Sequence, residues 1–305
     1  MVQQQARGTV EFVAEGVYVP AVRWLSAIVR FARRQPVGFA AGILIVVFIA
    51  VAFLNWVSGG VLTTHDPAQI GTGPRLGGPS LDHFFGTDER GRDLFSRVIE
   101  GAEISAFVGI MAVVVGVAGG GLVGVISGYA GRRADFLMQR VMDAMLSLPP
   151  LLVVLVLAAA LNPSATTVIL GLGLGFLPGA NRVIRSVTLA VKAEQHVEAA
   201  RAIGASNLRI VVRHILPNLL APVMILISIA IGAAIVAEAG LSFIGAGVQQ
   251  PSISMGQLLN AGRSFMEDAP WLVLAPGLAI TVVVLAFNLF GDSLRDHLDP
   301  RLRNS

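Results

Sequence analysis

The sequence predicts an all-α integral membrane protein with six membrane-spanning helices. Hydrophobic residues make up 54% of the 305-residue chain and charged residues only 13%, whereas soluble domains carry about 25% charged residues. The mean hydropathy is +0.74. Uninterrupted apolar runs recur along the chain, most of them near the roughly 20 residues that cross a bilayer. The 34 glycines suit helix interfaces in which backbones approach closely.

The six predicted spans follow from the positions of these apolar runs. They comprise residues 37–57, 104–127, 146–161, 167–191, 219–239 and 271–290. The third run is short, and Pro149 and Pro150 lie close to its start. The fourth run contains several glycines and the pair Pro178-Gly179. Such a composition predicts a broken helix that lines a cavity or packs against its neighbours.

Arginine and lysine are distributed unevenly between the two sides of these spans. We place the polar segment 194–217 in the cytoplasm and alternate sides from there. Only five of the 22 basic residues then fall on the opposite side. Because positively charged loops face the cytoplasm, we expect both termini to be cytoplasmic. The pI of 10.1 is therefore a topology signal, and no nucleic-acid partner is expected.

The topology divides the chain into five segments. These are a cytoplasmic tail over 1–35, the first span over 36–58, an extracytoplasmic loop over 59–103, a core of five helices over 104–291, and a second cytoplasmic tail over 292–305. In the first tail, Trp24, Ile28 and Phe31 recur at helical spacing among arginines. This pattern favours an amphipathic helix lying on lipid headgroups, and a solvated basic tail is the alternative.

A polar segment separates the fourth and fifth spans. It contains Glu198-Ala-Ala-Arg-Ala-Ile-Gly204, followed by His214-Ile-Leu-Pro217. We expect a short helix over 194–203 with a smooth face of small residues. Gly204 can adopt left-handed backbone angles and so end this helix.

A second short helix is expected over 205–215. One of its sides would carry the apolar residues Leu208, Val211, Val212 and Ile215, and the other Arg209 and Arg213. Pro217 should stop this helix and redirect the chain into the fifth span. Two short helices joined outside the bilayer form a compact knob that another protein can grip.

The spacing of this segment resembles the cytoplasmic coupling loop of bacterial ABC-importer permeases. The shared pattern is E-A-A, three residues, Gly, nine residues, then a hydrophobic-Leu-Pro end. The resemblance implies the type I importer permease fold, in which this loop docks into a cleft on a separate ATPase subunit and passes its motion to the membrane helices. The coupling positions implied are Glu198, Ala199, Ala200, Gly204, Ala205, Ser206, Leu208, Arg209, His214, Leu216 and Pro217.

The sequence argues against catalysis within this chain. A phosphate-binding P-loop needs a Gly-Lys pair, whereas the only lysine, Lys192, follows Val191. The five histidines lack H-x-x-x-H spacing, no G-x-S-x-G occurs, and cysteine is absent. We therefore expect no catalytic residue, metal or cofactor in this chain, with ATP and Mg²⁺ bound by partner subunits.

Three further segments narrow the resemblance to one branch. They are residues 85–97, with Phe-Gly-Thr-Asp-Glu-Arg-Gly-Arg-Asp, residues 240–249 and residues 291–303. They resemble the C-type subunit of the dipeptide/oligopeptide/nickel permeases. The resemblance implies a homologous B-type permease, two ATPase subunits and an extracytoplasmic solute-binding protein as partners, together with lipid of the bacterial plasma membrane. Gln250 and Met255 depart from the Pro and Trp common in this branch, which concerns the shape of one loop.

The function implied is ATP-driven uptake of di- and oligopeptides delivered by the solute-binding protein. The same machine carrying nickel chelates, glutathione, haem or another small solute is the nearest alternative. A stand-alone secondary transporter would need acidic groups near the midplane, but Glu238 is the only carboxylate in the predicted apolar runs. A scaffolding membrane protein would leave the elaborate loops unexplained.

Two further sets of residues complete the expected sites. Asn181, Glu238 and Asn288 are candidates for lining the solute pathway. The alternative role is interhelical hydrogen bonding for the two asparagines, and pairing with the backbone or with an arginine for Glu238. The residues expected to contact the solute-binding protein are Asp88, Arg90, Arg92, Asp93, Gln249 and Arg263.

Overall fold

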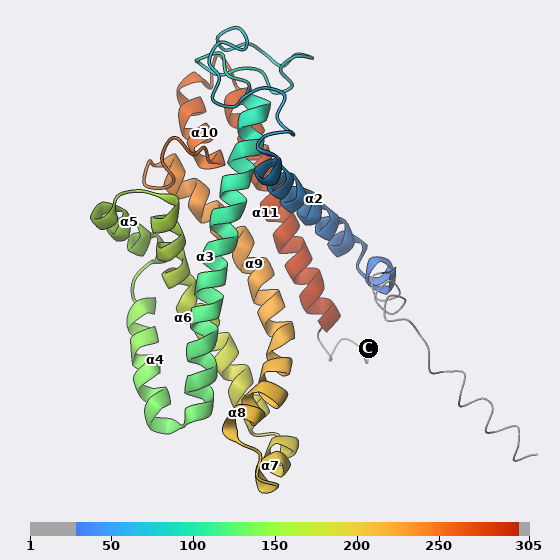
Figure 1. Ribbon diagram of the computed structural model, residues 1–305, viewed down its shortest axis with the longest axis vertical. Coiled ribbons are helices and arrows are strands. Elements are labelled where there is room, and N and C mark those ends of the chain that lie inside the picture. The colour runs from blue at the N-terminus through green and yellow to red at the C-terminus, as the bar shows by residue number, and fades with distance from the viewer. Residues whose placement is uncertain (1–28, 299–305) are drawn as a thin grey trace, which may run out of the picture.

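The computed structural model describes residues 29–298, and every regular element among them is a helix (Figure 1). The helices are, in chain order, α2 (Pro36–Ser58), α3 (Leu94–Ala130), α4 (Arg132–Leu146), α5 (Pro150–Leu161), α6 (Ala165–Lys192), α7 (Gln195–Ala202), α8 (Asn207–Ile210), the π-helical turn η2 (Val211–Ile215), α9 (Leu216–Phe243), α10 (Met255–Gly262), the 3-10 turn η3 (Arg263–Phe265) and α11 (Trp271–Leu298).

Five of the predicted spans are confirmed as helices long and apolar enough to cross a membrane. The bounds of α2 and α6 agree closely with the predicted runs. Three helices are clearly longer than predicted: α3 begins at Leu94 instead of residue 104, α9 covers Leu216–Phe243 instead of 219–239, and α11 continues to Leu298, into the predicted tail. The extra turns of α3 contain Arg97, which the apolar pattern excluded and which Asp88 neutralises at 3.1 Å.

The third predicted span, 146–161, is wrong as a single helix. The run instead contains the last residue of α4, a short break and all of α5, and the axes of α4 and α5 are bent by 80° at this break. Pro149 and Pro150 explain the bend, because proline disfavours helical geometry in the residue before it and begins a new helix well. The 12 residues of α5 rise only about 18 Å, less than the roughly 30 Å of a bilayer core. Within residues 29–298, only the bent pair together could form a sixth span.

The fourth predicted span is unbroken, contrary to expectation. α6 runs continuously from Ala165 to Lys192, with Pro178 inside it. Its glycines serve close packing instead of a break: a Cβ on Gly171 would lie 2.8 Å from Val154 of α5, and one on Gly173 would lie 2.7 Å from Val115 of α3. The glycine-rich composition therefore marks a helix with neighbours on two sides.

α3 and α6 form the most extensive helix pair of the described chain. Glycines recur every four residues along the facing stripe of α3, at Gly116, Gly120, Gly124 and Gly128. A Cβ on Gly120 would lie 2.2 Å from the carbonyl oxygen of Leu177, and one on Gly124 2.9 Å from that of Asn181. Small residues at this spacing let two backbones touch, as in membrane helix pairs generally.

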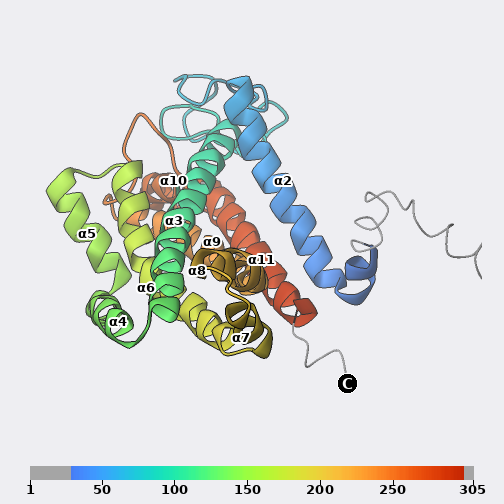
Figure 2. The same cartoon turned by 60° about the horizontal axis from the view of Figure 1, so that its bottom comes forward.

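The bundle has two distinct ends (Figure 1). Segment 59–93 and α10 lie at one end, and α7 and α8 lie at the opposite end. Figure 2, with that second end turned forward, shows α7 and α8 beside the ends of α6 and α9. Of the predicted amphipathic helix, residues 29–34 are helical, and Phe31 packs edge-on against Phe290 and His297. Trp24 and Ile28 lie outside the described residues.

Candidate functional site

The first part of the 194–217 segment folds as predicted. α7 begins after Glu194 and buries Val197 and Ala200, while Glu198 and Ala199 stay exposed. Gly204 then adopts φ +84°, a left-handed conformation that disfavours residues with a Cβ. Its N–H donates to the carbonyl of Arg201 at 3.0 Å, which closes the end of the helix. The turn at Gly204 is therefore confirmed.

The second part differs from the prediction. The Ser206 hydroxyl caps α8 by accepting from the N–H of Arg209, and the chain then passes through the π turn η2 directly into α9. Pro217 lies in the first turn of α9 and does not end a helix, contrary to expectation. A proline ring conflicts with the carbonyl four residues earlier, and the wider π turn at that place accommodates it. Residues 207–243 are thus one continuous helical rod.

The predicted apolar face of the second helix is only partly buried. Ile210 and Ile215 are fully buried, Val211 is half-buried, and Leu208 and Val212 are exposed. The π turn explains this pattern, because it places residues five positions apart on the same side of the helix. Ile210 and Ile215 therefore share the side that packs against the bundle. Leu208 is 74% exposed and Ile203 is 86% exposed. The knob formed by α7 and α8 therefore exposes two aliphatic side chains, Ile203 and Leu208.

The remaining coupling positions fall into two groups. Gly204, Ser206, Arg209, Leu216 and Pro217 are exposed, and Ala205 and His214 are half-buried. The rings of His214 and His196 lie 5.3 Å apart, centroid to centroid, and so hold α7 against η2.

Two residues that sequence reasoning missed anchor this knob to the bundle. Tyr129, at the end of α3, donates its hydroxyl hydrogen to Oδ1 of Asn207 at 2.9 Å. Lys192, at the end of α6, donates to the carbonyl of Tyr129 at 2.7 Å, with its ammonium 5.2 Å from the centre of the Tyr129 ring. A displacement of α8 would therefore also move α3 and α6, through these contacts, and α9, with which α8 is continuous. Isolated residues at helix ends carry no spacing signal that could have identified them.

The three pathway candidates differ in burial: two are fully buried and one is exposed. Glu238 is fully buried and accepts hydrogen bonds from the hydroxyls of Ser105 at 2.8 Å and Ser242 at 2.7 Å. Asn181 is also fully buried, and its Nδ2 donates to Oε1 of Gln139 at 3.1 Å. Only Asn288 is exposed, at the edge of a cavity of about 740 Å³ between α5, α6, α9 and α11. The contact of Asn181 matches the interhelical hydrogen bonding that was its alternative role. Glu238 pairs with two serine hydroxyls, and not with the backbone or an arginine as its alternative role expected.

Polar side chains along α4 face α6. Asp135 accepts from Nε of Arg185 at 2.6 Å, and Asp143 accepts from Arg182 at 3.1 Å. Gln139, between them in sequence, contacts Asn181. These residues repeat every four positions on α4, so they form one stripe. The stripe was not identified from the sequence because residues 132–146 were not predicted to be helical.

The residues predicted to contact the solute-binding protein also differ in burial. Asp88 is buried and accepts from the N–H groups of Arg90 and Arg92, from Nε of Arg92 at 2.7 Å and from Arg97 at 3.1 Å. Asp93 is fully buried as well. These two carboxylates hold the segment together and are out of reach of a docking protein. Arg90 is exposed and Arg92 is half-buried.

Two further contact candidates lie after α9. Gln249 and Arg263 are exposed, and the guanidinium of Arg263 lies 5.7 Å from the centre of the Phe243 ring. Of the six contact candidates, three are therefore exposed at the end of the bundle that carries segment 59–93: Arg90, Gln249 and Arg263.

Asp93 is the N-cap of α3. Burial alone would raise the pKa of its carboxyl, but hydrogen bonds from the hydroxyl and N–H of Ser96, from His83 and from Thr64 outweigh burial and lower the pKa below its ordinary value of 3.8. A carboxylate whose pKa is lowered by folding stabilises the folded state above its ordinary pKa. This contribution disappears as the pH falls through the lowered value.

We expect Asp93→Ala to reduce the free energy of unfolding by about 1–2 kcal/mol at neutral pH, the usual value of an N-cap. The thermal midpoint of the detergent-purified chain measures this effect. The exposed Asp82 provides the control, because Asp82→Ala removes a carboxylate from the same segment without a cap. The difference between the Asp93→Ala and wild-type midpoints should shrink below pH 3.8. A difference that stays constant with pH would contradict the role of the ionised cap.

Comparisons with known proteins identify the class that this fold and its terminal knob define. Residues 120–304 match the family described as binding-protein-dependent transport system inner membrane component. The chain belongs to this family, and it is a multi-pass membrane permease subunit. The predicted class is confirmed.

Relatives narrow this class to its peptide-permease branch, as the sequence predicted. A putative peptide transport system permease protein of Brucella suis biovar 1 is 40% identical over 274 residues, 90% of each chain. The dipeptide transport system permease protein of Alkalihalophilus pseudofirmus is 37% identical, over 95% of this chain and 94% of the relative. A probable D,D-dipeptide transport system permease protein of Escherichia coli K12 is 42% identical over 86% of each.

A solved structure is similar to this chain in fold. A chain of the MetNI methionine ABC transporter, in an inward-facing conformation, superposes with a TM-score of 0.50 at 19% identity. The match covers 68% of this chain and 96% of that chain. The likeness concerns the fold alone, and it confirms the predicted importer-permease fold.

Proposed function

We propose that this chain is the C-type permease subunit of an ATP-driven importer of di- and oligopeptides. In the proposed assembly it pairs with a homologous B-type permease above two ATPase subunits, and an extracytoplasmic solute-binding protein delivers the solute. The names of the relatives support a peptide cargo, since they include peptide, dipeptide and D,D-dipeptide permeases. A glutathione transport system permease of Pectobacterium atrosepticum, 38% identical, favours glutathione as the second candidate, and glutathione is itself a small peptide.

The observation that carries this proposal is the knob of α7 and α8. It projects from the end of the bundle and exposes Ile203 and Leu208, and a water-facing surface gains nothing from two bare aliphatic side chains. An apolar anchor flanked by the exposed Arg201 and Arg209 suits the cleft of a partner subunit. We assign that partner as the ATPase, because this sequence contains no P-loop and hydrolysis must be supplied from outside it.

The continuity of α8, η2 and α9 supports a mechanism for coupling. When the ATPases close, a force on Leu208 would be passed along the helical rod 207–243 without a flexible joint. The contacts of Asn207 with Tyr129 and of Tyr129 with Lys192 would pass part of it to α3 and α6. The solute would then move beside α9, where Asn288 borders the cavity of about 740 Å³.

This assignment also sets the proposed orientation. The knob and both termini would face the cytoplasm, and segment 59–93 with α10 would face outward. The exposed Arg90, Gln249 and Arg263 would then be available to the solute-binding protein. Their positions at the end opposite the knob agree with this arrangement.

The test of the proposed function is ATP-dependent uptake of a radiolabelled dipeptide by vesicles containing this chain with its co-expressed partners. Leu208→Glu places a charge on the proposed anchor, and we expect uptake to fall about tenfold or more, because a desolvated unpaired charge costs well over 1.4 kcal/mol. Leu81→Glu is the control, since Leu81 is 92% exposed and lies in segment 59–93, at the other end. Equal uptake by both variants, or uptake without ATP, would overturn the proposal.

A further inference from the structure

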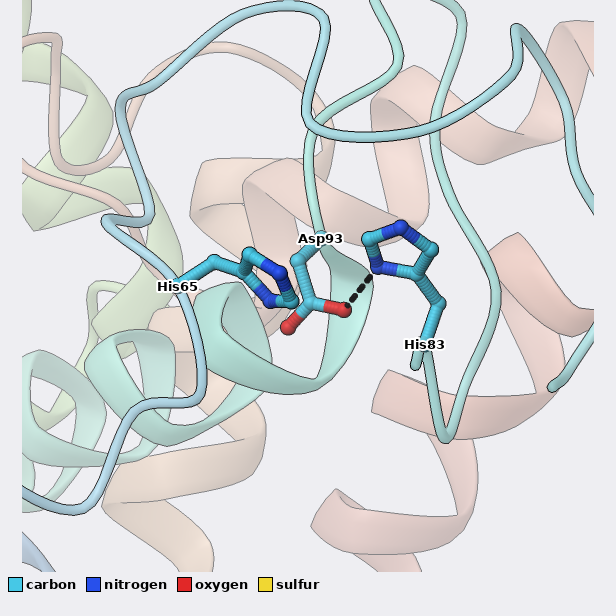
Figure 3. Close-up of side chains that lie close together, drawn as sticks. All are labelled: His65, His83 and Asp93. Carbon is cyan, nitrogen blue, oxygen red and sulfur yellow. Dashed lines mark hydrogen bonds and ion pairs between the residues drawn. The ribbon is translucent and has the colours of Figure 1, made fainter. Parts of the chain in front are cut away.

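Three potential metal ligands from distant parts of segment 59–93 meet at the start of α3. His65, His83 and Asp93 each offer one ligand atom, and all three atoms lie within 4.8 Å of one another. Figure 3 shows the carboxylate of Asp93 between the two imidazole rings. Nδ1 of His83 lies 2.9 Å from Oδ1 of Asp93, and the two ring centroids are 4.9 Å apart.

We propose that His65, His83 and Asp93 bind a divalent transition-metal ion, with Zn²⁺ as the best-fitting ion. Two imidazoles and one carboxylate, with a fourth position left for water, are a ligand set that Zn²⁺ accepts. Mg²⁺ and Ca²⁺ fit less well, because they require a shell of oxygen ligands. This chain has no cysteine, so thiolates offer no competing site.

The two carboxylate oxygens of Asp93 have different partners. Oδ2 accepts from the N–H of Ser96 at 2.9 Å, from the hydroxyl of Ser96 at 2.7 Å and from the hydroxyl of Thr64 at 3.0 Å. Among residues 29–298, Oδ1 contacts His83 alone. The carboxylate can therefore bind an ion through Oδ1 while Oδ2 continues to cap α3. For Nδ1 of His83 to bind the ion, the neutral ring must carry its proton on Nε2, so the contact with Asp93 Oδ1 is replaced by bonds from both atoms to the ion.

Backbone contacts hold both histidines in place. The N–H of His65 donates to the hydroxyl of Ser96 at 3.1 Å, which fixes residue 65 at the start of α3. The N–H of His83 donates to the hydroxyl of Ser80 at 3.1 Å, and the N–H of Ser80 donates to the carbonyl of His83 at 2.8 Å. Such outer partners orient the ligands of metal sites.

The three ligand atoms need to move only a short way to reach the spacing of a zinc-bound site. In a tetrahedral zinc site with bonds of about 2.0–2.2 Å, neighbouring ligand atoms lie about 3.3–3.6 Å apart. His83 is buried and already near this spacing. His65 is only half-buried, so its ring can rotate inward and the ion can enter beside it. The bound ion would tie segment 59–93 to the first turn of α3.

The test is Zn²⁺ binding by the detergent-purified chain, carrying an affinity tag without histidine, measured by calorimetry and by elemental analysis. It requires no transport and so stands apart from the proposed function. We expect about one tightly bound Zn²⁺ per chain, and a thermal midpoint that rises with added Zn²⁺. His65→Ala and His83→Gln should each weaken binding by about tenfold or more. Both variants leave the Asp93 cap of α3 intact, and the glutamine retains a donor toward it.

His196→Ala is the matched control, because His196 is an exposed histidine beside His214 at the opposite end of the bundle. We expect it to retain the tight site. Absence of stoichiometric Zn²⁺ binding by the wild-type chain would overturn the proposal. Binding that persists in His65→Ala and His83→Gln but is lost in His196→Ala would also overturn it, because the ion would then sit at the knob.

Discussion

Gly204→Pro is expected to abolish ATP-dependent uptake while the chain still inserts and folds. Proline requires a φ near −65°, whereas Gly204 has φ +84°, and proline also removes the N–H that donates to Arg201. The turn between α7 and α8 must therefore open, which displaces Leu208 from its place in the knob. Because this knob is the proposed grip of the ATPase, ATP hydrolysis should continue without driving uptake.

Gly59→Pro is the matched control for this substitution. Gly59 also has a left-handed φ, +65°, and its N–H also donates to a helix carbonyl, that of Asn55. A Cβ at Gly59, as at Gly204, would have no neighbour within 4 Å. The backbone cost is thus similar, but Gly59 lies at the other end of the bundle. We expect Gly59→Pro to retain most of its uptake. Unchanged uptake by Gly204→Pro, or an equal loss in both variants, would contradict the coupling role of the knob.

Gly120→Val should destabilise the whole bundle. Its Cβ would lie 2.2 Å from the carbonyl oxygen of Leu177 and 2.9 Å from the backbone nitrogen of Asn181, so α3 and α6 must separate. Overpacking of this kind costs about 3 kcal/mol when the obstacle is backbone that cannot turn aside. The yield of monodisperse protein and its thermal midpoint in detergent measure the effect.

Gly179→Val tests whether this loss arises from packing. Gly179 is also inside one of the paired helices, and nothing lies within 4 Å of the Cβ that it would carry. The change in helix propensity is therefore the same in both variants, and the packing differs. We expect Gly179→Val to remain close to wild type. If the two variants were equally destabilised, contact between α3 and α6 would not explain the loss.

The parts of the fold that were predicted correctly depend on local chemistry. A bilayer demands a run of apolar residues, so α2 and α6 could be located from composition within a few residues. The beginning of α3 could not, because its first turns contain Arg97, Glu100 and Glu103. The structure neutralises or pairs two of them through Asp88 and Asn55, which come from other segments.

The candidate sites divide in the same way. Gly204 was predicted because a glycine after a short helix has a local backbone meaning, and the structure confirms its left-handed turn. The exposure of Leu208 was not predicted, since it depends on the π turn that rotates α8 relative to α9. Pro217 illustrates the same limit: alone it predicts the end of a helix, but the π turn before it accommodates its ring and the helix continues.

The sequence by itself determined the membrane class of this protein, five of its spans and the turn at Gly204, because hydropathy and backbone preference act over a few neighbouring residues. Its permease family was indicated separately, by motifs that resemble those of known permeases. The tertiary structure alone decided that α4 and α5 bend apart, that Asp88 and Glu238 are buried, and that α7 and α8 are tied to α3. It also brought His65 and His83 to Asp93. Burial and proximity depend on how distant segments fold back on one another, and no spacing within the chain encodes them.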